Sequence, residues 1–405
     1  MDTERTEYDL GDLFRRYGLA YEQTHPLCLE QRKAIADISR CRTSMLGGHI
    51  QQCSDCGHQE IAYNSCSNRN CPKCQGIQQR KWVKARLSEL LPIQYFHAVF
   101  TIAQEYHDLL SYSSAKIYGA ISTTAAKVIK KLMKKYYGAE PGIIAVLHTW
   151  GQKLQDHPHV HMIITGGGLS LDKTRWIHCK GGYLLDIVEV QEEFKVEFAK
   201  EILKLHKYNQ LRLNTDRKTN PSAAKIQQIN DKACAKRWNV HIDKPFAGPE
   251  RVLEYAGRYT HCVAIRNSRI KYISDNGVVS FDYKDYKDRD DKGIPKHKTE
   301  ELSYDKFMGR FLRHVLPKGF RKVRMYGIFA GGNSKEKIEL CKSFFPADST
   351  ELESDDSRDI PPADMLCPVC KVGIMTNTQT IIELERAPPE IYNYYNVKTQ
   401  FSSAA

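Results

Sequence analysis

Five cysteines crowd into residues 53–74, and this cluster constrains the chain more than any other feature. They include two C-x2-C motifs separated by 14 residues. Two tight turns of this kind can deliver four thiolates to a tetrahedral Zn²⁺. The surrounding residues 49–76 are rich in Gly, Asn and Ser, too polar to form a hydrophobic core, so a metal must take its place. The predicted zinc ligands are Cys53, Cys56, Cys71 and Cys74, with Cys66, His49 or His58 as competitors for the fourth position.

Composition limits the class of protein. The 405 residues suggest two or three domains, and the net charge of +12 suits a polyanionic partner, although an enzyme of small anions or a ribosome-associated protein would look similar. No apolar run is long enough to span a membrane, and the charged N-terminus lacks the apolar core of a signal peptide. We therefore expect a cytoplasmic, nucleoid-associated protein without membrane contact, whose clustered cysteines bind metal instead of forming disulfides.

Shifts in composition divide the chain into three parts. Residues 1–91 are predicted to be a helical lead-in followed by the zinc-binding domain, and residues 92–345 a mixed α+β domain. Residues 346–405 are acidic and Pro-rich at their start and are predicted to be a weakly ordered tail. The tail contains one isolated C-x2-C motif, Cys367 and Cys370, which alone is weak support for a second zinc site.

Hydrophobic periodicity predicts the elements of the middle part. Aromatic and β-branched runs predict strands, the short polar loop between two of them predicts an antiparallel pair, and an Asn-Gly turn predicts a hairpin. The expected strands are 95–102, 143–150, 159–165, 322–330 and the hairpin 270–283. The expected helices are about 105–137, 194–205, 250–259 and 307–320, and the charged residues 285–300 are expected to form a mobile loop.

Two histidines stand two residues apart in one predicted strand. Side chains alternate along a strand, so His159 and His161 emerge on the same face and can bind one metal ion. The preceding strand ends with His148, which an antiparallel pairing would bring beside them, and His157 is the alternative third ligand. Such a pair also arises by coincidence. If it does bind metal, imidazoles with open positions and a phosphate substrate suit Mg²⁺ or Mn²⁺, and imidazoles alone also accept zinc.

Tyr255 and Tyr259 lie four residues apart in a predicted helix and therefore share one helical face. Packing is the default explanation for such a pair in a chain with 22 tyrosines. The residues next to the two tyrosines, Glu254, Ala256, Gly257 and Arg258, are polar or small, which together with the histidine strands favours a functional role. A phenol directed at a metal-polarised phosphodiester can form a covalent phosphotyrosine.

These segments together resemble the two-tyrosine HUH transposases of insertion-sequence-91 type over about residues 10–335. The similarity is carried by the cysteine cluster, LPIQYFHAVFTI, LHTWGQKLQDHPHVHMIITGGGLS, EYAGRYTHCVAIRNSRI and FLRHVLPKGFRKVRMYGIFA. The histidine–hydrophobe–histidine motif of that superfamily falls on His159, Val160 and His161, and its tyrosine pair falls on Tyr255 and Tyr259. The resemblance implies a palm-like antiparallel sheet flanked by helices, an N-terminal zinc domain and a catalytic divalent metal.

The resemblance also implies a function. The chain is expected to nick and rejoin single-stranded DNA by a rolling-circle route at the ends of its mobile element and in target DNA, with host replication proteins as further candidate partners. The spacing of His148 from His159 is that of relaxase-like relatives. The basic residues expected to contact DNA, each of which is individually also explained as a solvated surface charge, are Arg80, Lys81, Arg258, Lys318 and Arg321.

Three other functions remain open at this point. A replication initiator or relaxase would share the nuclease chemistry, although the chain has no GxxxxGK[ST] motif of an attached helicase. A zinc-dependent DNA-binding regulator would need no tyrosine chemistry. A transposase with three metal-binding carboxylates would need acidic residues that no segment singles out.

Overall fold

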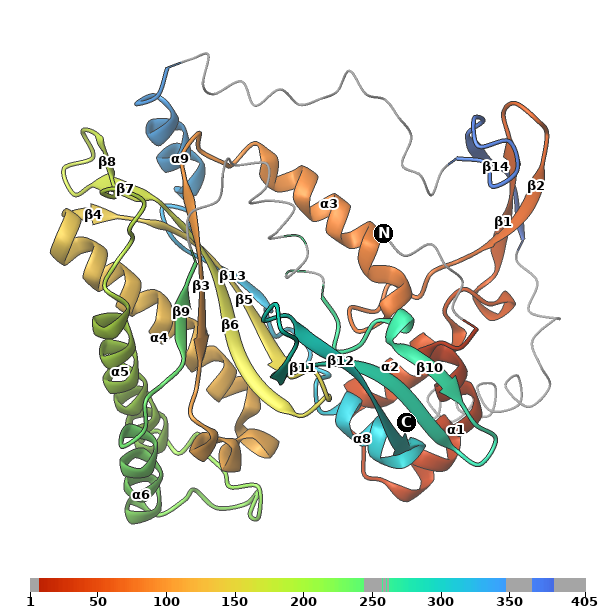
Figure 1. The fold of residues 1–405 in the computed structure, drawn as a ribbon, viewed down its shortest axis with the longest axis horizontal. Helices are drawn as coiled ribbons and strands as arrows, with labels where there is room; N and C mark the ends of the chain where they lie inside the picture. Colours follow the sequence, from red (N-terminus) through yellow and green to blue (C-terminus); the bar gives the residue numbers. More distant parts are fainter. Residues whose placement is uncertain (1–6, 244–256, 258–259, 261, 347–365, 382–405) are drawn as a thin grey trace.

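The computed structural model describes residues 7–243, 257, 260, 262–346 and 366–381 (Figure 1). Its architecture is α+β, as the sequence predicts: a central antiparallel sheet is flanked by helices, and a cysteine-rich segment lies beside it. In the described residues, no helix combines the length and apolar character needed to cross a bilayer.

The central sheet has five strands in the order β13-β5-β6-β3-β9, and every neighbouring pair is antiparallel. The predicted antiparallel pair is confirmed, since β5 and β6 are neighbours in the sheet. A short loop joins the two strands, and both are rich in β-branched residues, which favour strands. The bounds of the five strands are β3 Tyr95–Thr101, β5 Gly142–Trp150, β6 Asp156–Thr165, β9 Val240–Ile242 and β13 Val323–Gly327.

Three helices cover one face of this sheet (Figure 1). Alternate strand residues such as Phe100, Leu147 and Val160 point toward them and are essentially fully buried. The helix α4 ends at Gly138, whose backbone is left-handed, as is common where a helix stops. The bounds of these helices are α4 Leu110–Tyr137, α5 Ile187–Lys207 and α6 Ala223–Cys234.

The opposite face of the sheet is divided. At one end Tyr95, Ile144 and Ile163 pack under α9, whereas the other end carries histidines instead of apolar side chains. The small sheet β4-β7-β8 extends the apolar end. The elements at this end are α9 Ser334–Lys342, β4 Ala139–Glu140, β7 Gly167–Ser170 and β8 Trp176–His178.

A second hydrophobic core joins the two N-terminal helices to residues far along the chain. Leu13 and Ile35 of these helices pack with Phe281, Phe307 and Phe311. The expected boundary at residue 91 therefore does not separate two cores, because residues 264–315 complete the core of the N-terminal helices. The elements are α1 Leu10–Thr24, α2 Leu29–Arg40, β10 Ile270–Ile273, β11 Val278–Arg289, β12 Pro295–Ser303 and α8 Tyr304–Leu312.

Residues 285–300 correct one expectation. They are not a loop: most belong to β11 and β12, which form an antiparallel pair. Oppositely charged side chains face each other across the pair, including Lys298 with Asp285 and Asp288, each at 2.9 Å. Cross-strand charge pairs of this kind favour strand pairing in a segment that has little apolar character. The predicted helix 250–259 lies outside the described residues except at Gly257.

The cysteine-rich segment forms a separate three-stranded sheet in the order β14-β1-β2. Its third strand comes from the part predicted to be a weakly ordered tail. Residues 366–381 instead fold back onto the N-terminal hairpin (Figure 1). The bounds are β1 Gly48–Cys53, β2 Gln59–Tyr63 and β14 Met375–Ile381, and the helix α3 Gln75–Leu87 leads from this segment toward the central sheet.

Candidate metal centres

Three histidines converge on the face of the central sheet opposite α4 and α5. His148 of β5 pairs directly with His159 of β6, and His161 follows two residues later on the same face. The ring centroid of His148 lies 5.4 Å from that of His159 and 4.6 Å from that of His161. One ligand nitrogen from each of the three lies within 4.8 Å of the others. This arrangement can offer three imidazoles to one metal ion.

His157, the alternative third ligand, is not part of this group. Its side chain is exposed, and its contribution is a backbone carbonyl that accepts a hydrogen bond from Nδ1 of His159 at 2.6 Å. That bond fixes the proton on Nδ1, so the lone pair of His159 resides on Nε2. His148 stacks on Trp150, with ring centroids 4.9 Å apart. The ring of His157 lies 4.9 Å from that of His159, but only His148 completes a group whose ligand nitrogens all lie within reach of one metal ion among the described residues.

A hydrogen-bonded chain orients His161. Its Nδ1 lies 2.9 Å from Nε2 of His97, a residue of β3, and Nδ1 of His97 lies 2.5 Å from Oδ2 of Asp243. The carboxylate accepts the Nδ1–H of a neutral His97, whose Nε2 then accepts the Nδ1–H of His161. The lone pair of His161 is therefore placed on Nε2, the tautomer that a metal ligand needs. Sequence reasoning missed His97 and Asp243; the one signal was a histidine in an otherwise apolar strand.

Burial keeps these imidazoles neutral. Burial, and to a lesser extent the neighbouring His157, lowers the pKa of His159 to about 4. Burial and then the adjacent His148 hold the pKa of His161 well below its ordinary value, and burial also lowers the pKa of His97. Neutral imidazole is the metal-binding form. Near neutral pH, proton competition for this site is therefore weak.

A cavity of about 230 Å³ is lined by Trp150, the residue whose ring stacks on His148. Lys322 also lines this cavity, and its Nζ lies 5.0 Å from the centroid of the Trp150 ring. Desolvation lowers the pKa of Lys322 to about 8, which leaves the amine mostly protonated at pH 7. The cavity therefore combines an apolar wall with two basic side chains, Lys322 and Arg69.

Tyr255, Tyr259 and Arg258 lie outside the described residues. Two neighbours of theirs are described. A side chain at Gly257 would come within 2.8 Å of Val83 of α3, and Thr260 is buried in the wall of the cavity beside the histidines.

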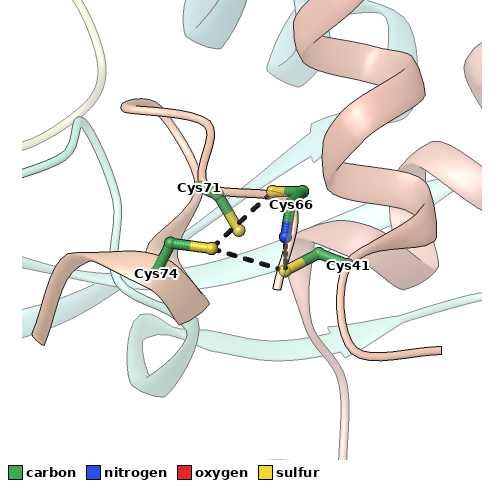
Figure 2. A group of neighbouring side chains, drawn as sticks. All are labelled: Cys41, Cys66, Cys71 and Cys74. Carbon is green, nitrogen blue, oxygen red and sulfur yellow. Dashed lines mark hydrogen bonds between the residues drawn. The ribbon is translucent and has the colours of Figure 1, made fainter. Parts of the chain in front are cut away.

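Four cysteines form a compact group at the base of the β1–β2 hairpin (Figure 2). Their sulfur atoms point toward one another, and the Sγ of Cys74 lies 3.6 Å from that of Cys41 and 3.7 Å from that of Cys66. Zinc with Zn–S bonds of about 2.3 Å in a tetrahedron requires sulfurs about 3.8 Å apart, so the group fits this ion. The four residues are Cys41, Cys66, Cys71 and Cys74.

This group corrects the predicted zinc ligands. Cys71 and Cys74 are members, but Cys53 and Cys56 are not; Cys66 and the unpredicted Cys41 take their places. The reason is the length of β1, whose six residues at about 3.3 Å each carry Cys53 on the order of 20 Å from the base of the hairpin. Neither His49 nor His58 belongs to a metal-binding group of the described residues.

The basic residues near the cysteine group of Figure 2 divide into two sets. Arg69 donates hydrogen bonds to the carbonyls of Leu316, Pro317 and Phe320, which fastens residues 316–320 to this group. Lys73 pairs with Asp9 at 2.6 Å. The predicted DNA contacts that the structure describes all have exposed side chains: Arg80, Lys81, Lys318 and Arg321.

Comparison with known proteins identifies the family. A family model described as "Transposase zinc-binding domain" matches residues 13–102, and one described as "Putative transposase" matches residues 142–337. The Sinorhizobium fredii (strain NBRC 101917 / NGR234) protein "Putative transposase y4qJ" is 36% identical over 96% of this chain and 99% of its own length. The chain belongs to the insertion-sequence-91 family of transposases.

A more distant relative agrees with this assignment. The Pseudomonas savastanoi pv. phaseolicola protein "Transposase for insertion sequence element IS801" is 25% identical over 78% of this chain and 72% of its own length. No solved structure matches the chain. Family membership makes this transposase a DNA-cleaving enzyme with DNA as its substrate, and the zinc-domain match includes all four cysteines of the group in Figure 2.

Proposed function

We propose that this transposase nicks and rejoins single-stranded DNA at the ends of its insertion sequence through 5′-phosphotyrosine intermediates, by a rolling-circle route. The observation that carries the proposal is the group of three neutral imidazoles on the central sheet, His148, His159 and His161. Two of them have a hydrogen bond that directs Nε2 toward the metal position. A site preorganised in this way supports metal-assisted phosphoryl transfer.

The donor set fits Mn²⁺ or another first-row transition ion at least as well as Mg²⁺, because imidazole is a nitrogen ligand. When bound, the ion would polarise the scissile phosphate and stabilise the charge on its oxygens. Lys322 adds a positive charge beside the same position. The apolar Trp150 wall lowers the local dielectric, which strengthens these interactions with a phosphate.

The proposed nucleophiles are Tyr255 and Tyr259. The hydroxyl of one tyrosine attacks phosphorus and gives up its proton to solvent. The bond from phosphorus to the 3′-oxygen breaks, and this oxygen takes up a proton to become a free 3′-OH. One phosphoester bond replaces another, so rejoining needs no ATP. The second tyrosine permits another cleavage while the first adduct persists.

The exposed basic residues are proposed to guide the strand to this site. Arg80 and Lys81 lie on α3, whose Val83 would be 2.8 Å from a Cβ at Gly257, a residue between the two tyrosines in sequence. Lys318 and Arg321 lie in the segment that leads into β13 and the cavity. Arg258 is proposed to hold a phosphate between the tyrosines. Contacts of this kind act through phosphate charge and do not read the base sequence.

Replacing the tyrosines tests the proposal. With Mn²⁺ or Mg²⁺ and labelled single-stranded DNA from the element's own ends, the chain is expected to yield a covalent protein–DNA band on a denaturing gel. Tyr255→Phe and Tyr259→Phe should each keep an adduct, whereas the double variant should form none, because phenylalanine lacks the attacking oxygen.

Tyr112→Phe is the matched control, since this tyrosine is 51% exposed on α4, and it should behave like the unmodified chain. Cleavage without any adduct would assign the attack to water. Binding of the authentic ends with no cleavage would instead support a DNA-binding regulator.

The series of hydrogen bonds from Asp243 through His97 to His161 gives a separate prediction. His97→Ala is expected to weaken Mn²⁺ binding about 10- to 100-fold, because His161 loses the acceptor that fixes its tautomer. The dissociation constant is measured by titration with Mn²⁺, independently of strand cleavage. His97→Gln should recover much of the affinity, since its amide oxygen can accept the same Nδ1–H.

Asp243→Asn should show an intermediate loss of affinity, because an amide holds Nδ1–H of His97 less strongly than a carboxylate does. Equal Mn²⁺ affinity in all these variants would show that the hydrogen bonds from Asp243 through His97 to His161 have only a structural role.

A further inference from the structure

A second group of four cysteines connects the N-terminal β1–β2 hairpin with residues 366–381. The Sγ of Cys53 lies 3.7 Å from that of Cys370, and the Sγ of Cys56 lies 3.6 Å from that of Cys367. All four sulfurs lie within 4.8 Å of one another. These separations are close to the sulfur–sulfur distance of about 3.8 Å that a tetrahedral zinc–thiolate site requires. The matched zinc-domain region ends at residue 102 and thus includes only half of this group.

In both C-x2-C motifs, backbone amides donate hydrogen bonds to cysteine sulfurs. Amide N–H groups of Asp55 and Cys56 donate to the Sγ of Cys53, each at 3.4 Å. The amide of Val369 donates to the Sγ of Cys367 at 3.4 Å, and the amide of Gly373 donates to Cys370 at 3.3 Å. Such N–H donors stabilise negative charge on sulfur, the form that binds metal. Both turns are therefore prepared to hold thiolates.

The chain reverses at each motif and closes a short hairpin around it. The amide of Cys53 donates to the carbonyl of His58 at 2.8 Å, and the amide of Cys367 donates to that of Gly373 at 2.7 Å. The last cysteine of each motif is followed by a residue with a left-handed backbone conformation: Gly57 with φ +71° and Lys371 with φ +62°. Two similar turns thus face each other across one centre, although 310 residues of chain separate them.

The sheet that bears these turns has almost no hydrophobic core. Besides the cysteines, its buried apolar cluster contains one further residue, Met375, among the residues that the structure describes. The pairing of β14 with β1 depends on backbone bonds and on polar contacts such as Gln51 Nε2 to Asn377 Oδ1 at 3.0 Å. So little apolar burial does not hold a small sheet together, and a bound metal is the usual substitute.

We propose that Cys53, Cys56, Cys367 and Cys370 bind one Zn²⁺ and that this ion fastens residues 366–381 to the N-terminal β1–β2 hairpin. Four thiols release four protons to solvent and form four Zn–S bonds, with no change in oxidation state. The chain then carries two structural zinc ions, one in each cysteine group. This proposal does not depend on the tyrosine mechanism.

Counting zinc in the full-length chain tests the proposal. The protein, purified under reducing conditions without chelator, is expected to contain two zinc ions per chain by elemental analysis. Cys367→Ser with Cys370→Ser should lower the content to one, because these ligands serve only the second site. Cys179→Ser with Cys234→Ser is the matched control and should retain two, because neither cysteine belongs to a group.

One zinc ion in the unmodified chain would overturn the proposal, and so would two in the Cys367→Ser, Cys370→Ser variant. Disulfides in place of zinc would overturn it as well; they would appear as four fewer titratable thiols in the denatured protein.

A glycine next to the site allows a test that removes no ligand. A Cβ at Gly373 would lie 2.3 Å from the Sγ of Cys53, so Gly373→Ala must displace a ligand. This variant is expected to lose its second zinc to a competing chelator at about tenfold lower chelator concentration. Gly332→Ala, where nothing lies within 4 Å of the added Cβ, should match the unmodified chain. Equal zinc retention in both glycine variants would contradict the proposed centre.

Discussion

His161→Ala is expected to reduce metal-dependent cleavage of single-stranded DNA on the order of 10³-fold, while binding of the same DNA persists. The ring centroid of His161 lies 4.6 Å from that of His148 and 4.9 Å from that of His159. Its Nδ1–H donates to His97, which in turn donates to Asp243. Its removal therefore takes away a ligand and also the group through which His97 acts. The measurement is the rate of adduct formation at saturating Mn²⁺, with strand binding followed separately by fluorescence anisotropy.

The matched control for this prediction is His178→Ala. His178 is an exposed histidine of β8, outside the metal-binding group, and its removal should leave the rate unchanged. A His161→Ala protein that cleaves at the unmodified rate would show that the three imidazoles take no part in the reaction. Circular dichroism of both variants separates this outcome from misfolding.

Cys71→Ser is expected to release one zinc ion and to lower the melting temperature sharply. Cys71 is fully buried where the zinc group meets the core shared by α1, α2 and α8. Structural zinc contributes apparent binding free energies of about 10–16 kcal/mol to small zinc domains, so its loss exceeds what this core can offset. Differential scanning calorimetry together with zinc analysis measures both effects.

Cys341→Ser provides a control of equal burial. Cys341 is also fully buried, but it belongs to α9 and lies outside both cysteine groups. Its replacement should cost about 1–3 kcal/mol for burying a hydroxyl and should release no zinc. If the two variants melted at the same temperature, the group in Figure 2 would not be a structural zinc site.

The histidine group could be predicted from sequence because it is local. Strand alternation places His159 and His161 on one face. The short loop after Trp150 then brings β6 back beside β5. These two constraints nearly determine the position of His148. The contribution of His97 was not predictable in the same way, since it depends on which strand pairs with the other edge of β6.

The zinc ligands are less predictable from sequence, because cysteines that are close in sequence need not be close in space. Two C-x2-C motifs 14 residues apart suggested one site, but the β1–β2 hairpin places them at opposite ends. Each then takes its remaining ligands from elsewhere: Cys41 after α2 in one case, and the motif at residues 367–370 in the other. The C-x2-C spacing singles out six of the eight cysteines in these groups but not Cys41 or the partners of each motif, which depend on the strand pairing.

The core that α1 and α2 share with residues 264–315 determines when the protein can fold during its synthesis. The first helices leave the ribosome early, yet Phe281, Phe307 and Phe311, which cover them, are made only after more than two hundred further residues. Until then the apolar faces of α1 and α2 have no permanent partner, a state that favours chaperone binding and aggregation. A copy of the gene with a stop codon before residue 264 would thus leave α1 and α2 without the residues that complete their core.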